Sequence, residues 1–425
     1  MRISQNLKSV CFFLFLAAVL IALIVFLNLS LMQAAKDGGD SSWYVAMAEG
    51  RLHEVIEPYS ARFLHTSLAG WLSKLFSTDA AHGFLVLAVF SVFAFLLIGG
   101  FLLKKTIPSP LLLMFLFAVP YLVMVLRRNI QPDAFSLFLT ALFFLLLFYE
   151  KEKTALITLF LLFLTRETTI LLGVILVAVS WFRGKKLFAL GALVVVIISF
   201  LVSGSISGIG QPNSHDLNPL VFMMFKFPYH FLANGMGVRL WVTGYDFCEP
   251  VLKLQLPPLG VLGSIREVGF CGFDAALPLR NYIALFSTFG VMPLAFVYAF
   301  AKKGWRTMKE LPFWFPVAVI YGLAMYAVSI PAGTGVSRIV GYAWPVFLLA
   351  TPFLVAPFVR ENRRFLAKFA GTQVFAAWMP FIVQEAGGFA SVPVMFFTLA
   401  ALGAAYVYTF LLLKKTFSSH FPVIG

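Results

Sequence analysis

The feature that most constrains the fold is a series of apolar stretches, each roughly 17 to 25 residues long, that recur along the whole chain. A helix rises about 1.5 Å per residue, so about 20 residues cross the hydrocarbon core of a bilayer. Hydrophobic residues make up 61% of the 425 residues and charged residues only 12%. A water-soluble core could not bury that much apolar surface. We therefore predict an all-α integral membrane protein.

Hydropathy places about twelve transmembrane helices along the chain. The first apolar run, Val10 to Leu31, follows Arg2 and Lys8 as in a signal peptide, but it is too long for the apolar region of one. It also lacks a convincing cleavage site, so we expect it to be retained. The predicted helices are 10–32, 83–103, 110–126, 134–149, 154–165, 168–182, 187–203, 281–301, 312–330, 338–359, 366–383 and 391–413.

Basic residues between these helices predict the topology. When the connections are assigned alternately to the two sides, one side collects most of the clustered Lys and Arg, so by the positive-inside rule it is cytoplasmic and holds both chain ends. The net charge of +14 is then a topology signal, and we expect no nucleic-acid partner. The clusters are Lys104 and Lys105, Lys151 and Lys153, 183–186, Lys302 and Lys303, 360–364, and Lys414 and Lys415.

Two long connections, about 33–82 and 204–280, fall on the opposite side. In the first, Trp43–Leu52 and Phe63–Phe76 have apolar residues at helical spacing, which predicts helices lying in the membrane interface. The second is rich in Gly, Pro and aromatic residues and is expected to be irregular. The chain thus divides into a transmembrane module (1–205), an outer loop (206–280) and C-terminal helices (281–425).

The outer loop contains Cys248 and Cys271. If the loop faces an oxidising compartment, these two cysteines can form a disulfide. Two buried free thiols are the alternative, since the sequence gives no geometry.

The turn at Arg166 and Glu167 joins two short predicted helices, 154–165 and 168–182. Twelve residues rise only about 18 Å, less than the roughly 30 Å hydrocarbon core, so both charges must lie below the outer membrane surface. Charge at that depth is tolerated where it packs in protein or lines a wet cavity. We infer an outward-facing cavity at this turn.

Two carboxylates, Asp37 and Asp40, follow the first predicted helix where the chain leaves the membrane. An ionised Asp there can act as a general base. Asp40 can equally cap the following helix by accepting hydrogen bonds from free backbone N–H groups. Spacing alone leaves both interpretations open.

Three segments resemble the GT-C glycosyltransferases, membrane enzymes that use polyprenyl-phosphate sugars and include the protein O-mannosyltransferases and the aminoarabinose transferases of lipid A. That family has an acidic residue after the first helix, a Tyr about four positions on, and an Arg at the start of the next helix. Asp40, Tyr44 and Arg62 match these positions. The segments are Asp40-Ser-Ser-Trp-Tyr-Val-Ala-Met-Ala-Glu49, Pro58-Tyr-Ser-Ala-Arg-Phe-Leu-His65 and Leu164-Thr-Arg-Glu167.

The resemblance implies a transferase that takes a sugar from a polyprenyl-phosphate donor and gives it to a membrane lipid or cell-envelope glycan. It implies a bacterial inner-membrane location with the site facing the periplasm, Asp40 as the base, and substrate contacts from Tyr44, Arg62, His65 and Glu167. Many family members have adjacent acidic residues, whereas two glycines separate Asp37 from Asp40 here, so the choice of base stays open. No large soluble C-terminal domain is predicted, so acceptor recognition would use the membrane portion and the 204–280 loop.

A leaving phosphate needs positive charge, and guanidinium groups bind phosphate oxygens through paired hydrogen bonds. Arg127, Arg128, Arg166 and Arg338 all lie on the predicted outer side, against the positive-inside bias, which favours a local role. Their alternatives are contacts with lipid headgroups and structural ion pairs. The histidines show no metal-ligand spacing, so we expect neither a metal nor another cofactor.

Two other functions are compatible with the sequence. A polysaccharide polymerase or ligase also holds a lipid diphosphate with outward arginines and uses a large outer loop, as 204–280 could be. A secondary transporter or lipid flippase would have a similar number of helices, but it typically has repeated halves or ionisable residues near the midplane. We find no convincing internal repeat, and the last five predicted helices, from 281–301 to 391–413, are nearly free of buried charge.

Overall fold

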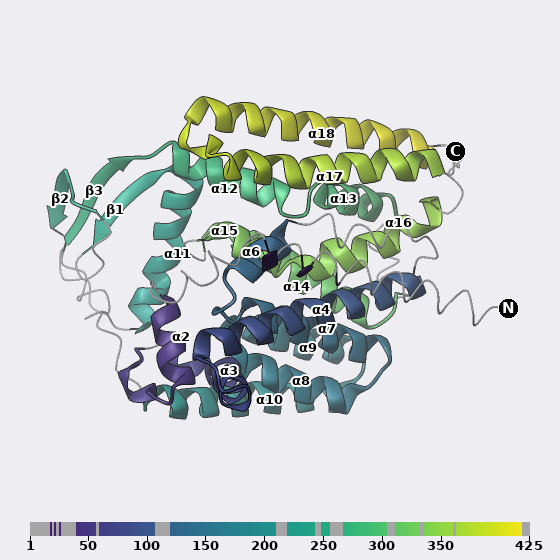
Figure 1. The fold of residues 1–425 in the computed structure, drawn as a ribbon. Coiled ribbons are helices and arrows are strands. Elements are labelled where there is room, and N and C mark those ends of the chain that lie inside the picture. The colour runs from purple at the N-terminus through teal and green to yellow at the C-terminus, as the bar shows by residue number, and fades with distance from the viewer. Residues whose placement is uncertain are drawn as a thin grey trace. The chain divides into compact units, whose positions relative to one another are not determined.

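The computed structural model describes residues 18, 21–22, 25–26, 40–56, 59–106, 120–209, 219–242, 248–255, 267–303, 311–331, 335–359 and 363–418. These residues belong to two compact units (Figure 1). The first unit comprises Met1–Phe117, Tyr121–Asn213 and Lys303–Tyr321, and the second comprises Ala118–Pro120, Ser214–Lys302 and Gly322–Gly425.

The regular elements of the first unit, among its described residues, are helices. Its elements are α2 (Asp40–Ala48), η2 (Leu52–Glu54), η3 (Tyr59–Ala61), α3 (Phe63–Leu75), α4 (Ala80–Thr106), α6 (Tyr121–Arg127), α7 (Asp133–Phe148), α8 (Glu152–Thr165), η4 (Glu167–Thr169), α9 (Ile170–Phe182), α10 (Lys186–Ser207) and the first part of α14 (Trp314–Val328).

The second unit combines helices with a small sheet. Its elements are α11 (Pro219–Met236), β1 (Val238–Val242), β2 (Leu252–Gln255), β3 (Glu267–Phe273), α12 (Ala276–Ser287), α13 (Met292–Lys303), the rest of α14, α15 (Val336–Gly341), the π-helix η7 (Pro345–Ala350), α16 (Thr351–Val359), α17 (Arg363–Glu385), η8 (Gly388–Ala390) and α18 (Val392–Ser418).

The helices confirm a membrane-embedded, mainly α-helical protein. Among the described residues, four helices are long and apolar enough to cross a membrane, or five if the bent pair α12–α13 is one span. The four are at Ala80–Leu103, Lys186–Ser207, Arg364–Glu385 and Val392–Thr416. Shorter apolar helices lie at Asp133–Phe148, Glu167–Phe182, Trp314–Val328 and Pro345–Ala356. A count of twelve stays a prediction, since most of 10–32 and 110–126 lies outside the described residues.

The two helices predicted in the first outer loop are present as α2 and α3. They pack closely, because Gly70 of α3 lies against the backbone of α2: a Cβ at Gly70 would be only 2.2 Å from the carbonyl oxygen of Ala48. α3 also packs on α4 and α8. This close approach fixes the loop on the bundle beside the turn between α8 and α9.

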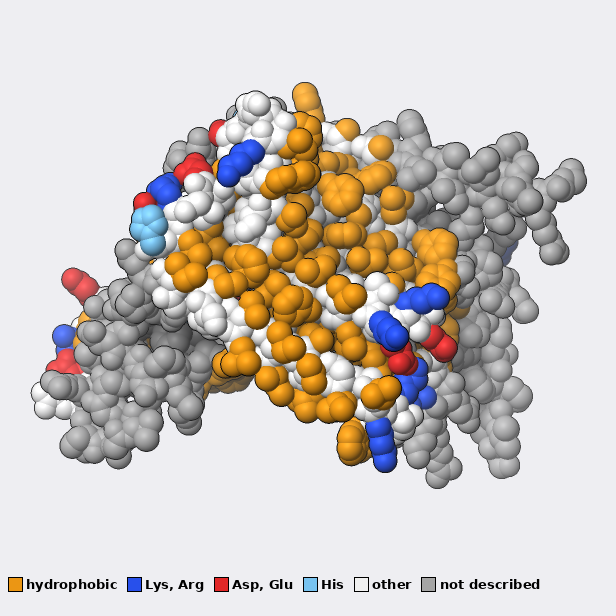
Figure 2. Space-filling model, turned by 90° about the horizontal axis from the view of Figure 1, so that it is seen from below, with side chains coloured by type: hydrophobic (Ala, Val, Ile, Leu, Met, Phe, Trp, Pro, Cys, Tyr) orange, Lys and Arg blue, Asp and Glu red, His pale blue; other side chains and the backbone are white. Residues whose placement is uncertain are grey.

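One face of the first unit is suited to contact lipid. Hydrophobic side chains cover the middle of this face, and charged side chains gather at opposite margins (Figure 2). α10 supplies a row of exposed apolar residues, among them Leu190, Ile197, Phe200 and Leu201, each at least half exposed. An apolar band between charged margins is the arrangement expected for a bilayer-spanning surface.

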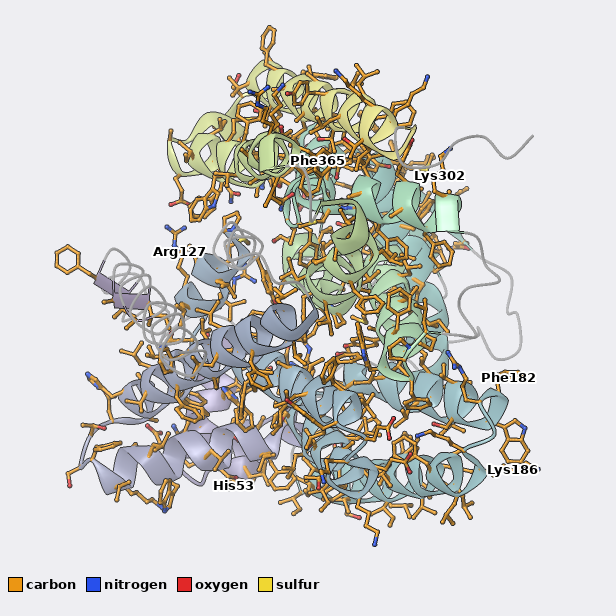
Figure 3. All side chains as sticks on the ribbon, turned by 90° about the vertical axis from the view of Figure 1, so that its right-hand side faces the viewer. His53, Arg127, Phe182, Lys186, Lys302 and Phe365 are labelled. Atoms are coloured by element: carbon orange, nitrogen blue, oxygen red, sulfur yellow. A yellow bond between two sulfur atoms is a disulfide. The ribbon has the colours of Figure 1, made fainter. Side chains whose placement is uncertain are left out.

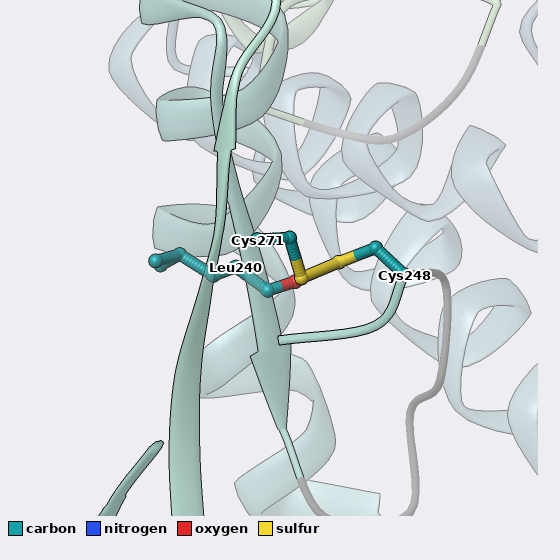
Figure 4. The surroundings of a disulfide bond; sticks show 3 residues. All are labelled: Leu240, Cys248 and Cys271. Carbon is teal, nitrogen blue, oxygen red and sulfur yellow. A yellow bond between two sulfur atoms is a disulfide. The ribbon is translucent and has the colours of Figure 1, made fainter. Parts of the chain in front are cut away.

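The segment 206–280, predicted to be irregular, instead contains the helix α11 and three strands among its described residues, and the strands depart from an all-α fold. β1, β3 and β2 form an antiparallel sheet in that order, with Leu240 and Leu252 both opposite Phe270. A disulfide joins Cys248 to Cys271 of β3, with Cα atoms 6.1 Å apart (Figure 4). The Gly and Pro residues that suggested irregular structure surround short Val-, Leu- and Phe-containing strands, and the disulfide ties the segment before β2 to β3.

The predicted helix 281–301 is divided into α12 and α13, which meet at an angle of 58°. The break contains Gly290 at φ +52°, a conformation that favours glycine. Backbone groups freed inside a membrane must find partners in the protein. Gln373 of α17, fully buried, donates to the carbonyl oxygen of Phe289 (2.9 Å) and accepts from the N–H of Val291 (2.8 Å). The hydroxyl of Tyr406 donates to the carbonyl oxygen of Gly290 (2.8 Å).

The predicted helix 338–359 is also interrupted, into α15, η7 and α16. Pro345 is the first residue of the π-helix. Proline has no N–H and its ring crowds the preceding turn, so Pro345 weakens regular α-helical bonding where the π-helix begins.

We predict that replacing Gln373 with Leu destabilises the protein by about 2–4 kcal/mol, because two backbone groups at the α12–α13 break lose their partner. Thermal unfolding of the purified protein in detergent measures this. The matched control is Thr372→Ala, since Thr372 is partly exposed and its hydroxyl donates to the carbonyl oxygen of Lys368 in its own helix. Equal melting temperatures for the two variants would show that Gln373 does not hold the break.

Candidate functional site

Asp40 is the first residue of α2 and is held by a tyrosine from the same loop. The hydroxyl of Tyr59 donates to Oδ1 of Asp40 at 2.8 Å, and both side chains are partly exposed. Burial and the neighbouring Asp40 carboxylate raise the pKa of Tyr59, so the hydroxyl stays a donor. The next residue, Ser60, is fully buried and its hydroxyl lies 3.2 Å from that of Ser207 in α10, which fixes η3.

Arg62, immediately before α3, connects this loop to the turn between α8 and α9. Its Nε donates to Oε2 of Glu167 at 2.8 Å, and a second nitrogen donates to Oε1 of the same carboxylate. Its remaining terminal nitrogen donates to the hydroxyl of Tyr44. The side chain of Arg62 is 9% exposed and that of Glu167 is 38% exposed, so the pair lies at the edge of the interior. A two-bond arrangement of this kind fixes both side chains.

Aromatic rings join the two hydrogen-bonded groups. The Arg62 guanidinium lies 5.3 Å from the ring centroid of Tyr59 and 6.0 Å from that of Tyr44. The two tyrosine rings meet edge to face with centroids 5.8 Å apart. Asp40, Tyr44, Tyr59, Arg62 and Glu167 therefore form one connected group, which we call the Arg62 cluster.

A second ion pair lies beside this cluster. Arg166 has extended backbone (φ −160°, ψ 122°), and Nη1 of Arg166 donates to Oδ1 of Asp133, the first residue of α7. Their side chains are 5% and 1% exposed. Burial raises the pKa of Tyr44, while the charges of Arg62 and Arg166 oppose that rise. Arg166 directly precedes Glu167, which binds Arg62, so the second ion pair lies next to the Arg62 cluster.

His65 lies under the Arg62 cluster. It is 1% exposed, and its ring centroid is 4.9 Å from that of Phe84 and 6.1 Å from that of Tyr44. Its Nδ1 has no hydrogen-bond partner among the described residues. Burial lowers the pKa of His65 to about 3, so the ring is neutral at physiological pH.

The structure separates the predicted site residues into a buried set and a partly exposed set. Tyr44, Arg62 and His65 are buried and support the site from beneath, whereas Asp40 and Glu167 reach the surface. The pairing of Arg166 with Asp133 favours a structural role for Arg166 over contact with phosphate.

The remaining predicted residues are not part of this cluster. Arg127 ends α6 and exposed Arg128 follows it, while Arg338 lies in α15 of the second unit. Asp37 lies outside the described residues. Within the described ranges, no group of three or more His, Cys, Asp or Glu side chains is arranged to hold a metal ion.

Sequence reasoning missed two residues of the site. Tyr59 lies in the segment 58–65, in which the resemblance singles out Arg62 and His65. The spacing between Asp40 and Tyr59 shows no helical or strand periodicity that would bring the two together. Asp133 directly precedes the predicted helix 134–149, a position where an acidic residue usually caps the helix. A buried Arg needs a counter-charge, however, and Asp133 is an acidic residue beside an apolar helix. The need of a buried arginine for a counter-charge could have suggested the pair of Arg166 and Asp133.

Comparisons with protein-family models, with curated proteins and with solved structures find no match. The class that the structure itself defines is a membrane-embedded helical protein with a buried charge cluster under its first described helices. The resemblance to GT-C glycosyltransferases stays a prediction.

We predict that Arg166→Met destabilises the protein by about 3 kcal/mol or more, because it leaves Asp133 as a buried charge without its guanidinium. The double variant Arg166→Met, Asp133→Leu should recover much of that loss, since both charges are gone. Unfolding midpoints of the wild type, Arg166→Met, Asp133→Leu and the double variant form a double-mutant cycle. If Arg166→Met alone has the stability of the wild type without any ligand, the ion pair is not structural.

We predict that His65 makes folding sensitive to acid. The unfolded chain binds a proton with an ordinary pKa of about 6.5, while the folded pKa is about 3, so stability is lost as pH falls from about 6.5 toward 3. Between pH 7 and pH 5 this amounts to about 2 kcal/mol. His65→Leu should reduce the drop in melting temperature over that interval. His53→Leu, at a 73% exposed side chain, should leave the drop unchanged; an unchanged drop in His65→Leu would contradict the prediction.

Proposed function

We propose that this protein is a membrane glycosyltransferase that moves a sugar from a polyprenyl-phosphate donor to a lipid or cell-envelope glycan on the outer face of its membrane. The observation that carries the proposal is the Arg62 cluster. It gathers Asp40, Tyr44, Arg62 and Glu167, the residues that the resemblance to GT-C enzymes singles out, from the first outer loop and from the turn between α8 and α9.

Asp40 is the proposed general base. Its carboxylate is partly exposed and is oriented by the Tyr59 hydroxyl, which leaves Oδ2 for an incoming hydroxyl. In a single displacement the acceptor oxygen attacks the anomeric carbon and gives its proton to Asp40. The bond from that carbon to the phosphate oxygen breaks, and polyprenyl phosphate leaves with the bonding electrons. The anomeric configuration inverts.

Arg62 and Glu167 have the supporting role in this proposal. Arg62 already donates to a carboxylate and to a tyrosine, and it is 7% exposed, so it acts on the reaction by holding Tyr44 and Tyr59 in place. The partly exposed Glu167 carboxylate is fixed by the same contacts and is placed to accept hydrogen bonds from sugar hydroxyls. Such fixed acceptors orient a sugar without contributing a second nucleophile.

The leaving phosphate carries negative charge that basic side chains must stabilise. Arg166 is committed to Asp133, so Arg127 and Arg128 are the proposed phosphate-binding residues of the first unit. Phosphate binding by Arg338, in the second unit, stays a prediction from the sequence. Exposed Arg128 is the first to test. Guanidinium groups suit this role because they bind two phosphate oxygens at once.

A secondary transporter is the second candidate, and the broken span α12–α13 is the observation that favours it. Transporters build substrate sites at helix breaks whose free backbone groups face the cavity. Here the groups at the break are bonded to side chains instead: Gln373 holds both Phe289 and Val291, and Tyr406 holds Gly290. This bonding suits a structural kink better than a substrate site.

We predict that Asp40→Asn lowers sugar transfer by about 100-fold or more, as expected for removal of a general base. Membranes containing each variant are supplied with a panel of radiolabelled polyprenyl-phosphate sugars and endogenous acceptors. Tyr59→Phe should lower transfer by less than Asp40→Asn does, because the carboxylate remains but loses the hydroxyl that orients it.

Two other variants complete this test. Asp37→Asn decides which of the two aspartates is the base. Glu49→Gln removes an exposed carboxylate of the same region that pairs with Arg51, and it should leave transfer unchanged. Failure of the wild type to use any donor would contradict the proposed reaction, whereas equal losses in Asp40→Asn and Glu49→Gln would contradict only the assignment of the base.

A further inference from the structure

A group of basic residues lies at one end of the helical bundle of the first unit, at the two turns α7–α8 and α9–α10. Residues 150–153 and 183–186 hold five basic and two acidic side chains, a formal net charge of +3. Lys185 of the second turn binds Glu152 of the first, with Nζ and Oε1 2.5 Å apart. This ion pair places the two turns side by side. We call the group 150–153 and 183–186 the basic rim.

The charges of the basic rim fall into two sets. Lys185 is held by Glu152 and also lies 4.8 Å from the ring centroid of Phe313, and Arg183 donates to the carbonyl oxygen of Leu311 at 3.0 Å. Lys151, Lys153 and Lys186 are exposed and form no ion pair within the described residues. The contacts of Lys185 and Arg183 make the rim rigid, and three lysines extend from it.

The rim borders apolar surface directly. Trp181, Phe182 and Leu187 are 59%, 88% and 85% exposed, although all three are large apolar residues. The Nζ of Lys186 lies 5.8 Å from the ring centroid of Trp181. Phe182 and Lys186 project from the same corner of the unit (Figure 3), and charged side chains form a margin of the apolar face (Figure 2). Apolar side chains this exposed are costly in water and favourable in lipid.

We propose that the basic rim binds the phosphate headgroup of an anionic phospholipid, with Lys151, Lys153 and Lys186 contacting the phosphate and Trp181 lying at the level of the headgroup. The acyl chains then run along the exposed apolar residues of α10. Lysines place an apolar stem along lipid and a charge at the headgroup, and tryptophan prefers the same depth.

Two further observations favour a lipid over a soluble anion. The three lysines lie next to exposed aromatic and aliphatic side chains that a soluble anion would leave in water. α8 and α10 also begin at this rim, at Glu152 and Lys186, and neither has a side-chain cap, so the partial positive charge of both helix ends adds to that of the lysines. The proposal does not depend on the glycosyltransferase reaction.

The test uses the full chain in nanodiscs or detergent micelles, with phosphatidylglycerol titrated against phosphatidylcholine. Bound lipid is counted by native mass spectrometry. We expect the triple variant Lys151→Gln, Lys153→Gln, Lys186→Gln to lower the preference for phosphatidylglycerol by about tenfold or more, because each lysine near an anionic headgroup contributes several-fold. The preference of the wild type should fall as salt increases.

Controls separate the basic rim from general charge. The matched triple variant Arg51→Gln, Lys74→Gln, Lys253→Gln removes three cations outside the rim, two of them exposed lysines, and it should keep the wild-type preference. Lys→Arg at the three rim positions should keep it too. The proposal is overturned if both Gln triple variants lose the preference equally, if the rim variant retains it, or if inorganic phosphate displaces the lipid at millimolar concentration.

Discussion

Arg62 is the residue on which the arrangement of the first unit depends. A guanidinium removed from water must satisfy its donors within the protein, and Arg62 does so through a carboxylate of one segment and a hydroxyl of another. Because Glu167 is 105 residues further along the chain, this requirement ties the first loop to the turn between α8 and α9. Loss of the arginine would leave Tyr44, Tyr59 and Glu167 without a common partner.

The same rule explains other interior features of this protein. Asp133 and Arg166 satisfy one another next to the Arg62 cluster, and Gln373 satisfies the backbone of a broken helix in the second unit. In lipid there is no water to replace such partners. Polar side chains in the interior therefore determine where helices end and bend, while apolar packing determines that they are helices.

The sequence predicts the helices well and the polar contacts poorly. The apolar runs at 83–103, 134–149 and 187–203 correspond to α4, α7 and α10, because hydropathy over about 20 residues is a strong signal. The helix breaks at Gly290 and Pro345 were missed, since an apolar run continues through each of them. The strands β1 to β3 are too short and too mixed with Gly and Pro to stand out.

The candidate site shows the same limit. Asp40, Tyr44, Arg62 and Glu167 were identified by resemblance and lie together, but the sequence does not indicate that Arg62 and Arg166 each have a carboxylate partner. Partner choice depends on side-chain direction across segments that are distant in the chain. The extended backbone of Arg166 turns its side chain toward Asp133, and the spacing of apolar residues does not indicate this change of backbone conformation.

The lengths of α8 and α9 have a consequence for the lipid around the protein. With 14 and 13 residues, these helices rise about 21 and 20 Å, well short of a hydrocarbon core of about 30 Å. α3, packed on α8, supplies protein where the helix ends early. If both helices cross the membrane, we expect the Arg62 cluster to lie at the depth of the acyl chains, so that the donor of the proposed reaction would approach sideways from the bilayer. Membrane thickness would then affect that proposed reaction, because a thicker bilayer would bury the entrance more deeply.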